Sequence, residues 1–269
     1  MNKIKSKDTY DAFSEDYDRF VNWEERLDTE IPFLTSQLEH LQAPNNHPLS
    51  LLDTACGTGM HAIELVKYGF RAAGADLSSQ MIRKAEENAR RAGVEVQFKA
   101  VGFGGLADAF QREYLFPFDA ILCLGNSLPH LLSIGEIENA LSDFAACLRP
   151  GGLLILQNRN FDAVLTRQDR WFPPQSHSRN GEERLFIRFY DFDPDGLVTF
   201  HIMRLQRSGD DEWKQEIDSV RLFPLTKYDL QSALSKNGFE DPLFFGKLEN
   251  VPFDPQNSGN LVASTRKKL

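Results

Sequence analysis

Short apolar segments alternate with segments of helical periodicity between Leu49 and Asn158, and this alternation restricts the fold more than any other feature. Repeated strand–helix alternation is typical of a parallel sheet with helices on both faces, a doubly wound α/β fold. Helices are expected from the first glycine turn to Tyr68, over Ser78–Arg91 and over Glu136–Leu148. The expected strands are Leu49–Asp53, Arg71–Ala75, Val94–Ala100, Phe118–Leu124 and Leu153–Asn158.

The pattern changes after Asn160, where turn-forming sequences separate longer strand-like segments. Turns at residues 193–196 and 208–211 suit antiparallel hairpins. Such an insertion would cover the strand ends, where ligands bind in open α/β sheets. A helix from Thr226 to Asn237 and two more strands would then complete a mostly parallel sheet of seven strands. The expected late strands are Glu183–Phe192, Leu197–Gln206 and Glu212–Phe223 in the insertion, and residues 242–246 and 260–266 in the main sheet.

Four segments follow from this pattern. Residues 1–48 are predicted to form a helical lid, with an amphipathic helix over Glu24–Leu41, and residues 49–160 the α/β core. Residues 161–224 form the antiparallel insertion, and residues 225–269 complete the core sheet.

Composition excludes several classes of function. The formal net charge is −9 and the Lys and Arg residues are scattered, which disfavours a nucleic-acid partner. No apolar run approaches the roughly 20 residues of a membrane span, and the basic start lacks the apolar stretch of a secretory signal. Three isolated cysteines predict neither disulfides nor a zinc site. We expect a cytoplasmic protein without a membrane or metal partner, and its oligomeric state stays open.

A glycine turn, Asp53-Thr-Ala-Cys-Gly57-Thr-Gly59, closes the first expected strand and opens the first helix. Glycines let a backbone approach a ligand closely, and a helix start presents free amides. With Ala62 and Asp76 the spacing also fits the dinucleotide pattern G-x-G-x-x-G/A, which would suit an NAD-dependent oxidoreductase. Asp53 favours another ligand, because a carboxylate at the strand's tip faces a positive amino group better than a pyrophosphate.

The turn resembles the first motif of class I S-adenosylmethionine (SAM) methyltransferases, D-x-x-x-G-x-G. The resemblance continues at Gly74-Ala-Asp76-Leu-Ser-Ser-Gln-Met81, Phe118-Asp-Ala-Ile-Leu-Cys123 and Leu148-Arg-Pro-Gly-Gly-Leu-Leu154. It implies that Asp76 binds the SAM ribose, although Asp76 would serve equally well to cap the helix at Ser78. The usual acid for adenine is replaced near Gly102, where backbone groups or Asp108 would have to substitute. The implied cofactor residues are Arg26, Asp53, Ala55, Gly57, Gly59, Asp76, Leu77, Met81, Phe103 and Leu124.

Three further strings are similar to the glycine N-methyltransferase group: Cys123-Leu-Gly-Asn-Ser127 with His130, Arg149-Pro-Gly-Gly, and Asn158-Arg-Asn-Phe161. This resemblance implies that Arg26 binds the SAM carboxylate and that Asn126 and Arg149 hold the acceptor's carboxylate. Alternatively, Arg149 faces solvent, and Asn126 and His130 make only loop hydrogen bonds. The remaining candidates for acceptor binding are Tyr10 and Asn160. The candidates for catalysis are His130 and Tyr17.

The function expected from these features is methylation of a small molecule by SAM, on the nitrogen of an amino-acid-like amine. A hydroxyl acceptor would need a base, for which His130 is the candidate. The alternatives left open are a small-molecule O-methyltransferase, an NAD-dependent oxidoreductase and a non-catalytic SAM-binding regulator.

Overall fold

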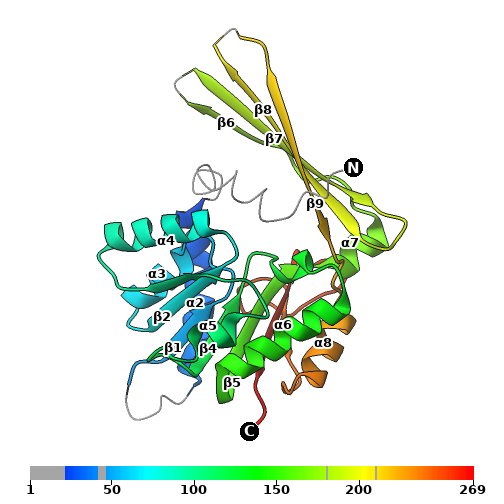
Figure 1. Cartoon of the computed structure of the whole chain (residues 1–269). Helices are drawn as coiled ribbons and strands as arrows, with labels where there is room; N and C mark the ends of the chain where they lie inside the picture. The colour runs from blue at the N-terminus through cyan, green and yellow to red at the C-terminus, as the bar shows by residue number, and fades with distance from the viewer. Residues whose placement is uncertain (1–21, 42–46, 180, 210) are drawn as a thin grey trace.

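The computed structural model describes residues 22–41, 47–179, 181–209 and 211–269, and its main body is one seven-stranded sheet (Figure 1). The sheet's strands are β1 (Ser50–Asp53), β2 (Arg71–Asp76), β3 (Gln97–Ala100), β4 (Phe118–Cys123), β5 (Leu148–Arg159), β10 (Leu243–Phe245) and β11 (Asn260–Arg266). Their spatial order is β10-β11-β5-β4-β1-β2-β3. The five strands from β3 to β5 run parallel, whereas β11 pairs antiparallel with β5 and with β10. A doubly wound, mostly parallel sheet was predicted and is confirmed.

Helices cover both faces of this sheet (Figure 1). One apolar core joins the strands to α5, α6 and α8 through residues such as Phe110, Phe144 and Leu230. The other core joins the strands to α2 and α3. Strand β5 is therefore buried on both faces: Leu154 and Leu156 belong to the first core, and Leu153 and Ile155 belong to the second. The helices are α2 (Trp23–Glu39), α3 (Met60–Lys67), α4 (Ser79–Ala92), α5 (Leu106–Phe110), η2 (Leu128–His130, a 3-10 turn), α6 (Ile134–Cys147), α7 (Phe161–Arg167) and α8 (Lys227–Lys236).

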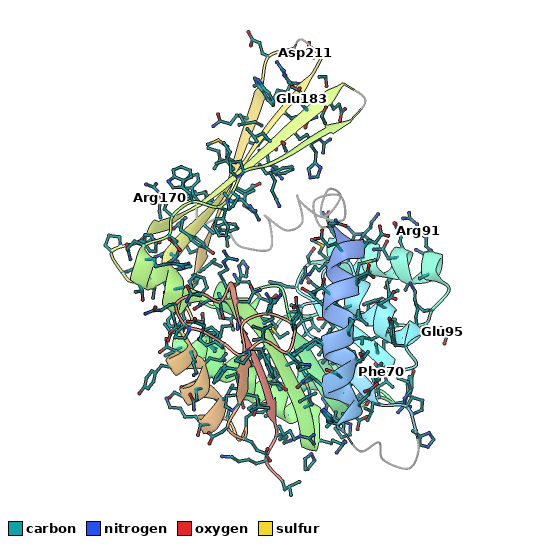
Figure 2. The ribbon with its side chains drawn as sticks, turned by 180° about the vertical axis from the view of Figure 1, so that it is seen from behind. Phe70, Arg91, Glu95, Arg170, Glu183 and Asp211 are labelled. Atoms are coloured by element: carbon teal, nitrogen blue, oxygen red, sulfur yellow. The ribbon has the colours of Figure 1, made fainter. Side chains whose placement is uncertain are left out.

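A second sheet of four antiparallel strands follows α7 and projects away from the core (Figure 1). Its strands are β6 (Gln175–Arg179), β7 (Glu182–Phe192), β8 (Val198–Ser208) and β9 (Lys214–Leu222), in that order across the sheet. Its base rests on a third apolar cluster that includes Phe161 of α7, Tyr190 of β7 and Leu222 of β9. Figure 2 shows Glu183 and Asp211 at the far end of this sheet and Arg170 nearer the core.

The structure adds elements that the pattern did not predict. Strand β6 is polar, and α5 and α7 have five and seven residues, too few to show a helical period. The second sheet falls within the predicted insertion, 161–224, but the four segment boundaries stay a prediction. Helix α2 matches the expected amphipathic helix. Residues 1–21 and 42–46 of the predicted lid segment lie outside the described residues.

Gly74 in β2 permits a close approach beneath the glycine turn. A Cβ at this position would lie 2.6 Å from Cδ1 of Phe98 and 3.0 Å from Sγ of Cys56. The Phe98 ring therefore crosses the strand where any side chain would collide with it.

We expect Gly74→Ala to lower the free energy of unfolding by about 1–3 kcal/mol, because the Phe98 ring must shift within a packed core. Gly135→Ala in α6 is the control, since a Cβ there meets no atom within 4 Å; its effect should be neutral or stabilising by up to about 1 kcal/mol. Urea unfolding of both variants measures the difference. Equal stability of the two variants would contradict the proposed collision.

Candidate cofactor and acceptor site

The glycine turn places two acids at one edge of the sheet. Asp53 ends β1, and Gly59, at φ +80°, caps the start of α3 in the left-handed region that glycine favours. The backbone N–H of Cys56 donates to the carbonyl of Ala75 at 2.9 Å, which ties the turn to β2. Asp76, the last residue of β2, therefore lies beside the turn.

The Asp53 carboxylate is buried without full hydrogen bonding. Asp53 is only 1% exposed, and the backbone N–H of Ala55 donates a hydrogen bond to its carboxylate. Its Oδ1 atom has no partner among the described residues. Burial raises the pKa of Asp53 to about 6, partly opposed by the nearby positive charge of His61. Because a buried polar atom normally has a partner, the orphaned oxygen indicates a ligand, and a cation would relieve the cost of its charge.

Asp76 organises the turn itself. Its two oxygens accept hydrogen bonds from the backbone N–H groups of Gly57 and Ser78, each at 2.9 Å. Ser78, not Asp76, is the N-cap of α4, and its hydroxyl accepts from the N–H of Met81. Since an ionised carboxylate has further acceptor capacity, Asp76 can still receive ribose hydroxyls.

Helix α2 brings an ionic chain to the Asp53 end of the site. Nε of Arg26 lies 3.0 Å from the Glu30 carboxylate, which in turn lies 2.5 Å from Nε2 of the buried His61. Burial alone would raise the pKa of Glu30, but the His61 and Arg26 contacts outweigh it and the pKa is lowered. The charges of both His61 and Arg26 also act on Asp53. The sequence interpretation missed Glu30 and His61, although Glu30 stands four residues after Arg26, the spacing of a helical ion pair.

The predicted adenine contacts lie in the loop after β3 and, for Leu77, directly after β2. Leu77 is 51% exposed, and its Cδ1 atom lies 3.0 Å from the position that a Cβ on Gly102 would take, so a side chain at residue 102 would require Leu77 to shift. Phe103 packs edge-on against Phe144 of α6 at 5.4 Å between ring centres. Asp108 lies exposed in α5. The two other apolar candidates, Met81 and Leu124, are almost fully buried.

The Asp143 carboxylate of α6 holds the same loop. It accepts hydrogen bonds of 2.8–2.9 Å from the backbone N–H groups of Gly104, Leu106 and Ala107. These amides are therefore engaged, and a backbone contact to adenine would have to come from the N–H groups nearer Gly102.

Asn126 and His130 lie after β4, beside the carboxyl end of β5. Asn126 has a left-handed backbone, φ +65°, and its side-chain oxygen accepts from the backbone N–H of Arg159 at 2.8 Å. Burial lowers the pKa of His130 to about 4, so its imidazole is neutral at pH 7. Asn126 therefore makes a loop hydrogen bond that places it next to Arg159, and its contact with an acceptor stays a prediction.

The structure contradicts the role predicted for Arg149. Its Nε lies 2.6 Å from Oδ1 of Asp119, the second residue of β4. Asp53 pairs with Leu122, farther along β4, and ligands of such a sheet bind beyond that end. Arg149 therefore lies at the amino end of the parallel strands, away from the predicted site, where it balances a buried acid.

Asn160 makes structural hydrogen bonds at the end of β5, and its contact with an acceptor stays a prediction. It is 2% exposed and caps α7, where its oxygen accepts from the N–H of Ala163. Its amide donates to the carbonyls of Pro255 and Ser258 at 3.1 and 2.9 Å. Both ends of the carboxamide are therefore occupied in fixing the loop before β11 to the end of β5.

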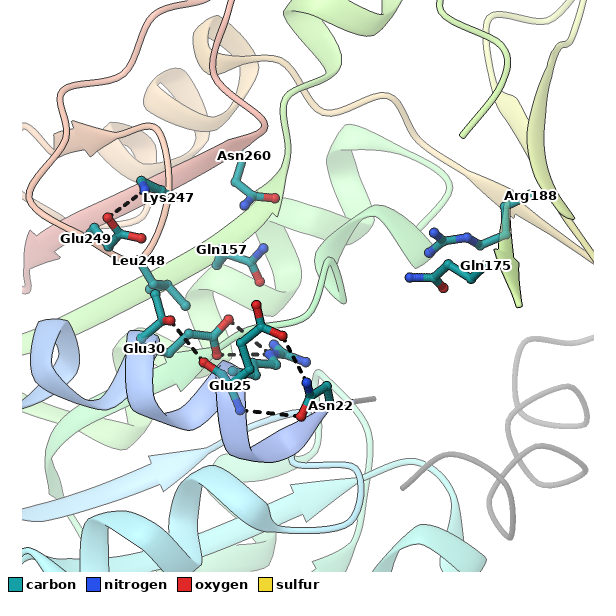
Figure 3. Close-up of a pocket in the computed structure, with 12 residues that line it drawn as sticks. Asn22, Glu25, Glu30, Gln157, Gln175, Arg188, Lys247, Leu248, Glu249 and Asn260 are labelled. Carbon is teal, nitrogen blue, oxygen red and sulfur yellow. Dashed lines mark hydrogen bonds and ion pairs between the residues drawn. The ribbon is translucent and has the colours of Figure 1, made fainter. Parts of the chain in front are cut away.

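A cavity of about 440 Å³ lies between the amino end of α2, the ends of β5 and β11, and the second sheet. Figure 3 shows Arg188 and Gln175 reaching from the second sheet toward Gln157 and Asn260 of the core sheet. Arg26 and Glu30 line the side formed by α2. Tyr10 and Tyr17, predicted to border an acceptor pocket, lie outside the described residues.

Comparison with known proteins identifies the core. Residues 51–152 match the family model of a methyltransferase domain. Residues 51–152 therefore form a methyltransferase domain. The chain is 34% identical over 168 residues to a glycine/sarcosine N-methyltransferase of Halorhodospira halochloris, covering 61% of this chain and 59% of that protein. It is 29% identical over 254 residues to the enzyme of the same description from Aphanothece halophytica, covering 93% and 88% of the two chains.

Solved structures agree on the fold. A methyltransferase structure from Streptomyces caelestis superposes with a TM-score of 0.74 at 19% identity, covering 97% of this chain and 98% of that one. The match to the Halorhodospira protein spans 59% of the length of that protein. Among the residues described here, no helix is long and apolar enough to cross a membrane, and no three candidate metal ligands cluster.

A cationic residue that the sequence interpretation passed over lies at the carboxyl end of β5. The half-buried Arg159 ends β5, and its guanidinium lies 5.0 Å from the centre of the Phe172 ring. No carboxylate of the described residues binds it. Arg159 belongs to one of the strings that carry the resemblance, Asn158-Arg-Asn-Phe161, and could have been considered with Asn126. The register of β4 and β5, which places Arg149 at the opposite end of the sheet, cannot be read from the sequence.

We expect Asp53→Asn to weaken SAM binding by the methyltransferase domain at least about tenfold at pH 7, because the donor's ammonium loses a buried counter-charge. The same change should stabilise the ligand-free protein. The folded-state pKa of about 6 exceeds the ordinary 3.8, so wild-type stability falls by up to about 3 kcal/mol as pH rises from 4 to above 6. Calorimetry of binding and thermal unfolding at several pH values measure both effects.

SAM affinity of the wild type should rise about tenfold per pH unit below pH 6 and level off above it, while the Asp53→Asn variant shows no such slope. Asp119→Asn is the control, since Asp119 is a buried acid at the other end of the sheet that already has partners. It should lose stability and keep its SAM affinity. Unchanged affinity in Asp53→Asn would exclude Asp53 as the donor's counter-ion.

Proposed function

We propose that this protein transfers a methyl group from SAM to the amino nitrogen of a small amino-acid-like acceptor. Arg159 is the observation that carries the proposal, because its guanidinium has no carboxylate partner among the described residues and would suit the carboxylate of an acceptor. The named relatives are glycine/sarcosine N-methyltransferases, which supports an amino-acid acceptor.

The residues present fit SAM. The orphaned Oδ1 of the buried Asp53 suits the ammonium of the donor, and Asp76 retains acceptor capacity for the ribose. Arg26 stands at the same end for the donor's carboxylate. Once bound, SAM supplies a methyl group already activated on a sulfonium, so the protein's task is to position the nucleophile.

The state of His130 favours an amine over a hydroxyl as the nucleophile. A hydroxyl needs a base whose pKa lies near the working pH, and burial holds the pKa of His130 at about 4. An ammonium acceptor can lose its proton to water before binding and needs no such base. His130 in this proposal is a neutral hydrogen-bonding residue of the acceptor pocket.

Transfer of labelled methyl from SAM to glycine, sarcosine and alanine, with glycolate and lactate as hydroxyl counterparts, tests the proposal. We expect methylation of the amines alone. Arg159→Gln should raise KM for the amino acid by about 10- to 100-fold, since it removes a charged contact. Arg149→Gln, compared on folded protein, should leave KM unchanged. No transfer to any amine, or equal effects of the two arginine variants, would contradict the proposal.

His130→Ala should lower kcat for an amine acceptor by less than about tenfold, whereas loss of a general base costs about 100-fold or more. In the wild type, the pH profile of kcat/KM should follow deprotonation of the acceptor's amine and show no second inflection in the range measured. Steady-state kinetics of both proteins between pH 5 and 9 measure this. A 100-fold loss in the variant would instead assign His130 as a base.

A further inference from the structure

The two faces of the second sheet differ in what covers them. Tyr190 of β7 and Leu222 of β9 belong to the apolar cluster around Phe161 of α7, so the even-numbered residues of β7, β8 and β9 form the inner face, toward the core. Farther along, this inner face is charged, and Arg204 lies 2.7 Å from Asp218. Because side chains alternate along a strand, the odd-numbered residues of the three strands form an outer face that points away from the core. A sheet with one face on a core normally has a polar second face.

The outer face is instead apolar in its central rows. Its apolar residues belong to none of the three apolar clusters of the described residues, and Ile217 is 47% exposed. Two exposed tryptophans extend it, since Trp171 packs on Phe189 at 4.9 Å between ring centres and Trp213 lies 4.9 Å from the Arg207 guanidinium. The strand register aligns its apolar residues, which are Leu185, Ile187, Phe189, Met203, Leu205 and Ile217.

Polar residues of the outer face pair with one another around this apolar centre. At the far end Arg207 forms an ion pair with Glu183. Toward the base, the His201 ring lies 2.7 Å from the Ser219 hydroxyl and 3.0 Å from the Asp191 carboxylate. An apolar centre within a polar rim is the composition of a protein–protein interface. Since these rim charges already have partners, a protein that covers the face needs to supply no counter-charge.

The outer face is also large enough for a stable interface. Strands β7 and β8 have 11 residues each. At about 3.4 Å per residue and about 4.8 Å between strands, the three strands β7 to β9 make a face about 37 Å long and about 15 Å wide. Two such faces in contact would bury about 1,100 Å² in total, which is within the range of specific interfaces.

We propose that the outer face binds the outer face of a second copy of this chain, so that two copies form a dimer through a two-layered β-sandwich. A two-fold axis between the sheets, along the row of Ile187, Met203 and Ile217, stacks the apolar rows of the two copies on one another. It places Met203 opposite its counterpart and leaves the paired charges at the rim. Arg188, which lines the cavity, lies on the inner face, so the dimer leaves the cavity open and does not depend on the proposed function.

Sedimentation velocity of the full chain tests the proposal. We expect the wild type to sediment at twice the mass of the chain at micromolar concentration. Ile217→Lys should raise the dimer dissociation constant at least about 30-fold, because a symmetric dimer receives the new charge twice at its apolar centre. Circular dichroism should show an unchanged fold, since the Ile217 side chain is half exposed.

Leu243→Lys is the matched control. Leu243 lies in β10, at the edge of the main sheet, and is 65% exposed, so the variant gains the same charge at an exposed apolar residue outside the second sheet. Its dissociation constant should equal that of the wild type. A monomeric wild type, or equal effects of the two lysine variants, would overturn the proposal.

Cysteine cross-linking tests the symmetry of the dimer. The native Cys56, Cys123 and Cys147 are buried, so a cysteine introduced at the surface is the reactive one. In packed sheets about 10 Å apart, Met203→Cys comes within reach of its counterpart through a short bismaleimide. We expect this variant to cross-link into a dimer and Leu243→Cys to stay monomeric under the same conditions. Cross-linking of Leu243→Cys alone, or of neither variant, would reject the proposed interface.

Discussion

The burial of one carboxylate at the tip of β1 is the constraint on which the donor end of this molecule depends. Asp53 is charged at neutral pH in a place that raises its pKa to about 6, and one of its oxygens lacks a partner among the described residues. The surrounding fold keeps water away and supplies weak compensation through His61 and Arg26 of the adjoining helices. This burial makes the ligand-free protein less stable than it could be, and the Asp53 carboxylate can still bind a cation.

Much of the core follows from the sequence because its signals are local. A parallel strand buried on both faces reads as an apolar run, and a glycine turn must follow β1 if a helix is to start there. The long hairpins of the second sheet also carry local turn signals at residues 193–196 and 208–211. Strand β6 was missed because it is polar, and α5 and α7 were missed because five and seven residues are too few to display a helical period.

The acceptor end was predicted less well because it depends on the register between distant segments. Arg149 and Arg159 stand at opposite ends of the same strand, so a resemblance of short strings places either of them near the site. Pairing of Leu148 with Phe118 decides the matter, since it sets Arg149 beside Asp119 and leaves Arg159 at the ligand-binding end. Asn160 shows the same limit: its partners, Pro255 and Ser258, are more than 90 residues away.

In the proposed function, donor and acceptor recognition depend on separable parts of the molecule. The donor end uses β1, β2 and α2, whereas the acceptor end joins the tip of β5 to the second sheet through Phe172 and the cluster around α7. Arg188 belongs to a sheet with its own antiparallel ladder, so its side chain can change without disturbing the register of the core strands. A fold divided in this way lets the charge of the acceptor site vary while the Asp53 turn, with its strict backbone demands, stays as it is.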